Sequence, residues 1–292
     1  MTSVVDQQLT PQAVTARSGS SFLAGFALLF GPRRAGMTAI YAFCRVADDA
    51  VDDANSASEG EQRLAFWRAE LERAERGTPT TPIGAALQQT FARFGSTVAP
   101  LRELLDGMAM DLHTVSYRTL DALEVYCHRV ASAVGLGCLP VLGANGADAE
   151  HFAERLGRAL QLTNILRDIK ADAEIGRVYV PTQWLHECRV DPLWLLGSGP
   201  TMAYVSGGPV AQVCERIALI ARERFAEADA ALRRLPWRMR RRLLPARIMG
   251  AIYRDLLRLL ALRGGNLSVG RLRVARGRKF WLSMCVLLGV GG

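Results

Sequence analysis

Apolar residues along this chain recur mostly three and four positions apart, which is the spacing of an amphipathic α-helix. Alternating, strand-like runs are scarce, whereas alanine, leucine and arginine are abundant. The pattern predicts helices over residues 22–30, 33–53, 60–76, 83–95, 99–114, 119–137, 148–172, 210–235, 236–263 and 271–288. The sequence therefore predicts an all-α protein built as a helical bundle.

Glycine and proline mark the boundaries of these helices. Pro32 suits the first turn of the helix that follows it. Residues 173–182 contain a glycine and a proline that cannot continue a helix, so they predict a flap directly after the helix over 148–172. No linker divides the chain into two halves. We therefore expect a loose polar leader over residues 1–17 and a single domain over residues 18–292.

Two short acidic segments stand out from this helical pattern. Asp48 and Asp52 are four residues apart, so they share one face of a helix. Tyr41 and Arg45 fall within about 60° of them on the same face. Aspartate is a poor residue for a helix interior, yet four of the six residues 48–53 are aspartate. A local violation of propensity of this kind often marks a functional site.

The second segment repeats the arrangement about 120 residues later. Gln161, Asn164, Asp168 and Asp172 fall within about 80° of one another on a helix whose remaining surface is apolar. All four offer the oxygen ligands that Mg²⁺ prefers, and burying such a stripe without cations would be costly. Arg167 lies beside the stripe and could bind a phosphate with both arms of its guanidinium. The alternative is an exposed, chemically inert face.

Two such stripes facing one another suit a cluster of Mg²⁺ ions that grips a diphosphate. Apolar walls below them would suit a hydrocarbon tail. Metal ions would neutralise the diphosphate as a leaving group, so that an allylic C–O bond can ionise, and aromatic rings would shelter the cation from water. The chain shows no Ser-His-Asp or Cys-His arrangement, and this chemistry needs none.

The net charge of +8 comes largely from arginines that cluster late in the chain, in residues 238–242 and 271–279. Such clusters suit a solvated basic face, an anionic membrane or an anionic substrate. Nucleic acid is not an expected partner, because no zinc finger or aromatic RNA-binding motif accompanies the arginines.

The six cysteines lack disulfide or zinc-site spacing, and the polar N-terminus is not a signal peptide. We therefore expect a cytoplasmic protein. The longest apolar run, residues 280–290, falls short of the roughly 20 residues that span a bilayer. With the basic stretch before it, this run predicts either a peripheral contact with an anionic membrane or a last core helix.

The sequence resembles the squalene/phytoene synthase family of head-to-head prenyl transferases over about residues 18–285. The motifs that carry the resemblance are Ser20-Ser21-Phe22, YAFCRVADDAVDD at 41–53, Tyr126 with VASAVG at 130–135, and QLTNILRDIKAD at 161–172 followed by GRVYVP at 176–181. Their order and separation make the resemblance specific. It implies an all-α isoprenoid synthase fold with a central cavity and two Asp-rich motifs that bind Mg²⁺ and diphosphate.

The resemblance also implies roles for individual residues. The implied metal ligands are Asp48, Asp52, Asn164, Asp168 and Asp172. Contacts to diphosphate are implied for Ser21, Tyr41, Arg45, Gln161, Arg167, Arg177 and Arg271. The reaction centre would be lined by Tyr126, Tyr179 and Tyr253. The prenyl channel would be shaped by Val130, Ala131, Val134 and Gly135.

The chain departs from some relatives near its N-terminus, where Ser18-Gly19-Ser20-Ser21-Phe22 stands in place of a His-Ser-x-Ser-Phe pattern. Its motifs are most similar to those of the bacterial presqualene diphosphate synthases of hopanoid biosynthesis. These enzymes join two farnesyl diphosphates and leave reduction to a downstream squalene-forming enzyme, so no NADPH is expected here. Phytoene, squalene or dehydrosqualene synthesis, or a non-catalytic assembly factor with the same fold, are the alternatives.

Overall fold

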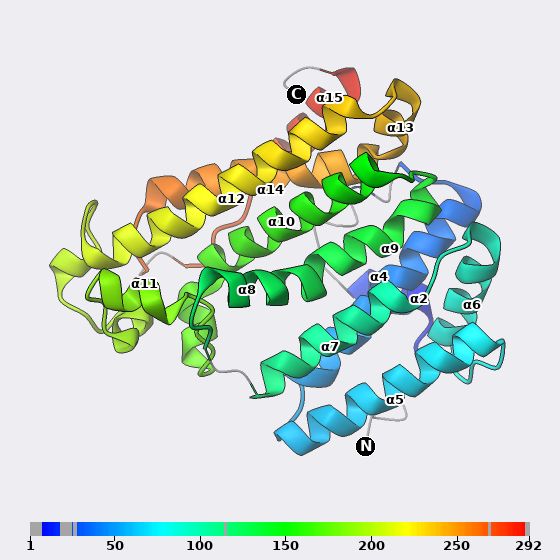
Figure 1. Cartoon of the computed structure of the whole chain (residues 1–292), viewed down its shortest axis with the longest axis horizontal. Coiled ribbons are helices and arrows are strands. Elements are labelled where there is room, and N and C mark those ends of the chain that lie inside the picture. Colours follow the sequence, from blue (N-terminus) through cyan, green and yellow to red (C-terminus); the bar gives the residue numbers. More distant parts are fainter. Residues whose placement is uncertain (1–7, 18–24, 26–27, 114–115, 268–269, 290–292) are drawn as a thin grey trace.

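The computed structural model describes residues 8–17, 25, 28–113, 116–267 and 270–289 (Figure 1). Its helices are α2 (Pro11–Arg17), α4 (Gly31–Asp52), α5 (Ala57–Arg76), α6 (Pro82–Phe94), α7 (Ala99–His113), α8 (Leu120–Cys127), the π-helix η1 (His128–Ser132), α9 (Ala133–Leu142), α10 (Ala147–Glu174), α11 (Thr182–Glu187), η2 (Pro192–Leu196), η3 (Thr201–Ala203), α12 (Pro209–Arg234), α13 (Trp237–Arg242), α14 (Leu244–Arg263) and α15 (Arg276–Leu288). Within these residues the β pairing is one isolated bridge between Ser116 and Val178. The predicted all-α fold is confirmed.

The short helices α11, η2 and η3 were not predicted, and the helix predicted over 22–30 falls largely on residues that the structure does not describe. Four further differences from the sequence expectation concern longer segments. The stretch predicted as one helix over 119–137 runs on to Leu142 and contains a π-helical turn. The stretch predicted as one helix over 236–263 is interrupted at Leu243, because Pro245 opens α14 and supplies no N–H to the turn before it. Helix α15 begins at Arg276 rather than at 271. Residues 11–17, within the expected leader, form helix α2 with Val14 buried.

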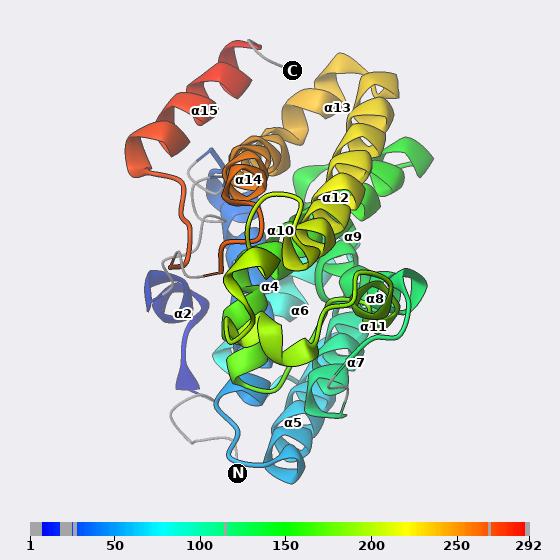
Figure 2. The same ribbon diagram turned by 90° about the vertical axis from the view of Figure 1, so that its left-hand side faces the viewer.

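The helices pack as two groups that share α9. Helix α4 packs against α5, α6 and α7, whereas α10 packs along α12, and α9 contacts both α4 and α10 (Figures 1 and 2). On α4 the face of Ile40, Phe43 and Ala47 is buried in the core. The polar stripe of α4 therefore lies on a different face of the helix from these three residues.

The segment from Leu120 to Leu142 is long and apolar enough to cross a membrane by length and composition. It packs against α7 and α10, and 44% of its most apolar window is buried inside the protein. Its Glu124 and Ser132 are hydrogen-bonded to neighbouring helices. These contacts are those of a core helix.

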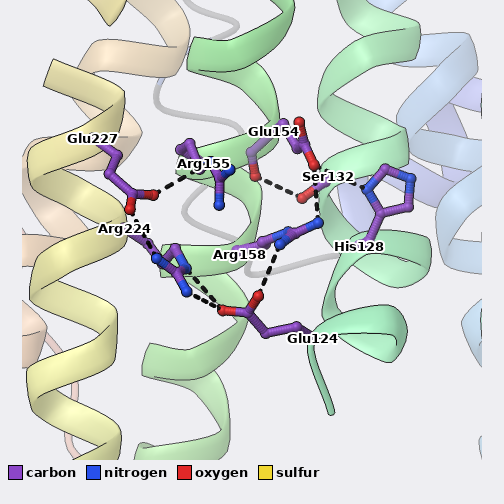
Figure 3. Close-up of polar contacts among 8 residues, drawn as sticks. All are labelled: Glu124, His128, Ser132, Glu154, Arg155, Arg158, Arg224 and Glu227. Atoms are coloured by element: carbon purple, nitrogen blue, oxygen red, sulfur yellow. Dashed lines mark hydrogen bonds and ion pairs between the residues drawn. The ribbon is translucent and has the colours of Figure 1, made fainter. Parts of the chain in front are cut away.

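A partly buried polar network fastens this segment to α10 and α12 (Figure 3). The Glu124 carboxylate accepts hydrogen bonds from Arg158 of α10 and Arg224 of α12, each at 2.8 Å. Arg158 also donates to Glu154 at 2.8 Å, and the Ser132 hydroxyl donates to the Glu154 backbone carbonyl at 2.7 Å. Each charged group of the network is thus paired, which offsets the cost of removing it from water.

The backbones of α10 and η1 also lie in close contact. A Cβ atom on Gly157 of α10 would lie 2.5 Å from the Ser132 Cα and 2.6 Å from the Ser132 nitrogen. These are backbone atoms of the π-helix, which cannot turn aside as a side chain could. The glycine lets α10 reach the wide turn of η1, and π-helical turns are frequent at functional sites.

We expect Gly157→Ala to lower the free energy of unfolding by about 1–3 kcal/mol or more, because α10 must move away from η1. Urea denaturation followed by circular dichroism measures this. Gly277→Ala is the matched control, since Gly277 lies in helix α15 with open space around it and should be neutral or slightly stabilising. Equal stabilities for the two variants would contradict the proposed packing role.

Candidate active site

The polar stripe of α4 holds its charges in a local ion-pair cluster. Arg45 donates to Asp48 at 2.9 Å through Nη1 and contacts Asp49 at 2.5 Å through Nη2. Tyr41, half-buried, lies one turn before Arg45 on the same helix face. Asp52, at the end of the helix, is exposed. The guanidinium of Arg45 therefore occupies the space beside the first acidic pair.

The stripe of α10 is more buried and centres on Asp168. Arg167 binds its carboxylate at 2.9 Å and 2.5 Å, and Arg271 binds the same two oxygens at 2.9 Å each. Burial raises the pKa of Asp168, but these two guanidiniums outweigh it and the pKa lies below its usual range. Tyr253 of α14 is a further hydrogen-bond partner of Arg167. Arg271, far away in the sequence, is thus brought into the site.

Asn164 and Gln161 extend the stripe one to two turns before Asp168. The Asn164 amide donates to Gln161 Oε1 at 3.3 Å. The Asn164 Oδ1 atom is buried and has no hydrogen-bond partner in the described structure. A buried carbonyl oxygen without a partner is costly unless a ligand satisfies it. It lies one helical turn from Asp168, so an oxygen-preferring cation fits this position.

Arg177 connects the two stripes. Its Nη1 donates to Asp52 Oδ1 at 3.0 Å, across 125 residues of sequence. Its backbone nitrogen donates to the Asp172 carbonyl at 2.8 Å, where the chain leaves α10. The loop that was predicted as a flap therefore positions a cation between the acidic end of α4 and the acidic end of α10.

Asp111 of α7 is a site residue that the sequence analysis missed. Its two carboxylate oxygens accept hydrogen bonds from the Tyr126 hydroxyl at 2.8 Å and the Tyr179 hydroxyl at 2.7 Å. The two hydroxyls lie 3.3 Å apart, and the two rings stack with centroids 5.0 Å apart. The signal was an aspartate between apolar neighbours inside a predicted helix, the same violation of propensity that revealed the other aspartates.

A third ring, Tyr117, completes the aromatic cluster. Its centroid lies 5.5 Å from that of Tyr126 and 5.9 Å from that of Tyr179. Its own hydroxyl is buried and has no hydrogen-bond partner among the described residues. Two backbone groups of this segment hold the flap: the Tyr117 carbonyl accepts from Thr182 at 2.8 Å and the Arg118 carbonyl from Gln183 at 3.1 Å.

The carboxylates raise one another's pKa. Burial, and then the charge of Asp52, raise the pKa of Asp48 to about 7. Burial, and then the charge of Asp168, raise the pKa of Asp172 to about 7. Burial also raises the pKa of Asp111, against the effect of its two tyrosine donors. Asp111 contributes to the field at both Asp48 and Asp172, so α4, α7 and α10 share one electrostatic site.

The raised pKa values of Asp48 and Asp172 show that the arginines of the site do not fully offset the cost of burying these two carboxylates. Within the described residues no three His, Cys, Asp or Glu side chains form a group that could hold a metal ion. Each helix supplies two carboxylates, so an ion here would take further ligands from a bound anion. The oxygen donor set and the unpartnered Asn164 Oδ1 fit Mg²⁺ under that condition.

The residues expected to shape a prenyl channel lie on the segment between α8 and α10. Val130, Ala131, Val134 and Gly135 are all half-buried, on η1 and α9. A Cβ atom on Gly135 would lie 3.2 Å from the Ala153 carbonyl of α10, so this glycine serves helix packing. Ser21, expected to contact diphosphate, lies outside the described residues.

Comparison with known proteins identifies the family of the chain. The sequence matches the family described as squalene/phytoene synthase over residues 15–278. It is 37% identical to the presqualene diphosphate synthases of Rhodopseudomonas palustris and Zymomonas mobilis, covering 84% and 86% of this chain and 85% and 84% of theirs. It is 40% identical to phytoene synthase 1 of Arabidopsis thaliana over 58% of this chain and 41% of that one.

The structural comparison agrees. A ligand-bound dehydrosqualene synthase superposes with a TM-score of 0.83 at 27% identity, covering 96% of this chain and 94% of that one. The fold and the acidic helices define an all-α prenyltransferase with the isoprenoid synthase fold. The chain belongs to the squalene/phytoene synthase family.

We expect Tyr126→Phe and Tyr179→Phe each to lower the free energy of unfolding by about 1–3 kcal/mol, because each leaves one oxygen of the buried Asp111 unpaired. Tyr117→Phe is the matched control and should be close to neutral, since its hydroxyl has no partner among the described residues. Urea denaturation of the three variants measures the difference. Equal destabilisation by all three would show that the hydrogen bonds to Asp111 do not matter.

We also expect Mg²⁺ to displace protons from the site. With pKa values near 7, Asp48 and Asp172 are each about half protonated at pH 7, and only the carboxylate binds a cation. Apparent Mg²⁺ affinity should therefore rise between pH 6 and pH 8. Calorimetric titration at pH 7 in two buffers of different ionisation enthalpy should show release of about one proton.

The matched variants for this titration are Asp172→Asn and Asp121→Asn. The first should weaken Mg²⁺ binding and reduce the proton release. The second changes an exposed aspartate of α8 and should alter neither. A pH-independent affinity without proton release would contradict the assignment of these carboxylates to the ion.

Proposed function

We propose that this prenyltransferase joins two molecules of farnesyl diphosphate head to head to give presqualene diphosphate and diphosphate, with Mg²⁺ as cofactor. The observation that carries the proposal is the meeting of two carboxylate stripes beside Asp111, bridged by Arg177. The relatives named presqualene diphosphate synthase, similar over more than four fifths of the chain, support this product. The relatives named phytoene synthase match a shorter part.

The arginines give the site its affinity for a diphosphate. Arg45, Arg167, Arg177 and Arg271 now pair with carboxylates around the site. These guanidiniums would bind the phosphate oxygens of the substrate, for which their planar fork is suited, once the carboxylates held a cation. The same side chains therefore balance the aspartates in the free enzyme and hold the substrate in the complex.

The metal ligands would be Asp48 and Asp52 on α4 and Asn164, Asp168 and Asp172 on α10. Mg²⁺ held there supplies neutralisation of the departing diphosphate, which allows the allylic C–O bond to break. Asp168 has a lowered pKa and remains ionised throughout the neutral range. Asp48 and Asp172 carry raised pKa values, so their ionisation depends on the arrival of positive charge.

The tyrosines act as a neutral aromatic wall. Burial raises the pKa of Tyr126 and of Tyr179, and each hydroxyl donates a hydrogen bond to Asp111. The phenols therefore stay protonated, and their ring faces can stabilise a carbocation. The 2,3-double bond of the second farnesyl group attacks this cation, and proton loss closes the cyclopropane. The diphosphate released in the first step, or a water bound to a tyrosine, would accept that proton.

Other products of the same chemistry remain to be separated by experiment. Phytoene would require C20 substrates, whereas squalene or dehydrosqualene would require a further step after the cyclopropyl diphosphate. A non-catalytic assembly factor with this fold would not need its metal ligands, yet all four stripe aspartates are present here. A downstream squalene-forming enzyme would consume the proposed product on the way to hopanoids.

The product assay tests the proposal directly. Purified protein with Mg²⁺ and farnesyl diphosphate should release diphosphate without NADPH and yield a C30 diphosphate, detected by mass spectrometry. Asp48→Ala and Asp168→Ala should each reduce turnover by at least about 100-fold with unchanged helical content, because each removes a ligand of the leaving group's counter-ions. Asp121→Ala should retain full turnover. A C40 hydrocarbon formed solely from geranylgeranyl diphosphate would overturn the substrate assignment.

A further inference from the structure

Helix α15 carries an apolar stripe on its outer surface. Phe280, Trp281, Leu287 and Leu288 are 70%, 60%, 40% and 71% exposed. With the half-buried Met284 they occupy positions i, i+1, i+4, i+7 and i+8, which lie on one face of a helix. The stripe is contiguous and no described part of the protein covers it.

The opposite face of α15 holds the helix on the protein. Leu282 and Val286 are partly buried against the core, and α15 packs along α14. Arg278 donates to the buried Asp255 of α14 at 2.9 Å. The helix is thus docked by one apolar face and by the ion pair with Asp255, and the described residues leave its second apolar face uncovered.

Arginines without carboxylate partners surround this stripe. In the part of the chain that the structure describes, neither Arg273 nor Arg276 forms an ion pair, and both lie close enough to lower the pKa of Lys279, after burial as the first cause. Helix α13 adds a second basic group at the same end of the molecule (Figures 1 and 2). This group consists of Arg238, Arg240, Arg241 and Arg242, and none of them pairs with a described carboxylate.

The second basic group also has an aromatic centre. Trp237 is 56% exposed, and the guanidiniums of Arg238 and Arg241 lie 5.6 Å and 5.8 Å from its ring centre. Tryptophan with arginine is a combination that suits the boundary between lipid headgroups and acyl chains. Two separate elements therefore present aromatic and cationic side chains at one end of the bundle.

We propose that α15, with α13, docks this enzyme on the surface of an anionic lipid bilayer. An apolar helix face with flanking Arg and Lys is what an interfacial helix needs, with its apolar side chains among the acyl chains and its cations on anionic headgroups. A second copy of this chain fits poorly, because a symmetric contact through α15 would bring the same arginines together. Nucleic acid would use the arginines and leave the apolar stripe in water.

The test measures vesicle binding without substrate, so it is independent of the proposed reaction. Wild-type protein should co-sediment with vesicles of equal parts phosphatidylcholine and phosphatidylglycerol, and much more weakly with phosphatidylcholine alone. Its tryptophan emission should shift to the blue, and Trp281→Phe and Trp237→Phe should each remove part of that shift while they retain binding. Turnover of farnesyl diphosphate in solution should be unchanged in these surface variants.

Two variants separate the apolar from the ionic part of the contact. Phe280→Ser with Trp281→Ser should weaken binding by more than about tenfold, since both side chains leave the acyl region. Arg273→Gln with Arg276→Gln should weaken it by about fivefold for each charge removed and reduce its dependence on salt. Leu219→Ser changes an exposed leucine of α12, a helix outside the proposed contact, and is the matched control.

Several results would overturn the proposal. One is the absence of binding to the anionic vesicles. Another is binding that the Phe280 and Trp281 variant leaves unchanged. A dimer in sedimentation equilibrium that the same variant dissociates, without vesicle binding, would assign the stripe to a second copy. Melting curves of all variants should match the wild type, which separates these outcomes from misfolding.

Discussion

The charge balance of five aspartates holds this site together. Asp48 and Asp52 of α4, Asp111 of α7, and Asp168 and Asp172 of α10 contribute to one electrostatic site. Such a group is costly in a folded protein unless cations or donors compensate it. The compensation comes from four arginines in separate parts of the chain, and from two tyrosine hydroxyls on Asp111. The guanidiniums that could bind an anion are thus already present in the site, where they pair with carboxylates.

This balance explains the placement of elements that are distant in sequence. Arg177 reaches α4 only because the flap after α10 turns back at residues 175–181 and is held by backbone hydrogen bonds to Tyr117 and Arg118. Arg271 reaches α10 only because the chain returns after α14. Neither the flap around Arg177 nor the segment around Arg271 has much regular structure of its own. Their positions are fixed by the carboxylates they pair with, which makes the ordering of the flap sensitive to what binds the aspartates.

The helical stripes could be predicted because they are local. Spacing alone placed Asp48 with Asp52, and Asn164 with Asp168, on common faces of helices that the structure confirms. Asp111 could not be assigned in this way, because its role depends on the approach of Tyr126 and Tyr179 from two other elements. The π-helix could not be predicted either, because a run of apolar and small residues does not reveal a change from i→i−4 to i→i−5 hydrogen bonding. The faces of single helices could therefore be predicted from the sequence, whereas contacts between residues far apart in the chain could not.

The π-helix has a consequence for how this segment can vary. A π-helical turn contains one residue more than an α-helical turn, so η1 offsets α9 relative to α8 by about 100° of rotation compared with an unbroken helix. Deleting one residue of this turn would restore α-helical hydrogen bonding and leave the facing of α9 unchanged, because the loss of one residue cancels the offset. Gly135 would then keep its place against Ala153, whereas contacts made by the turn itself, such as that of Ser132 with the Glu154 carbonyl, would change. The segment that both helix groups share can therefore lose one residue at this point without a change of register in α9.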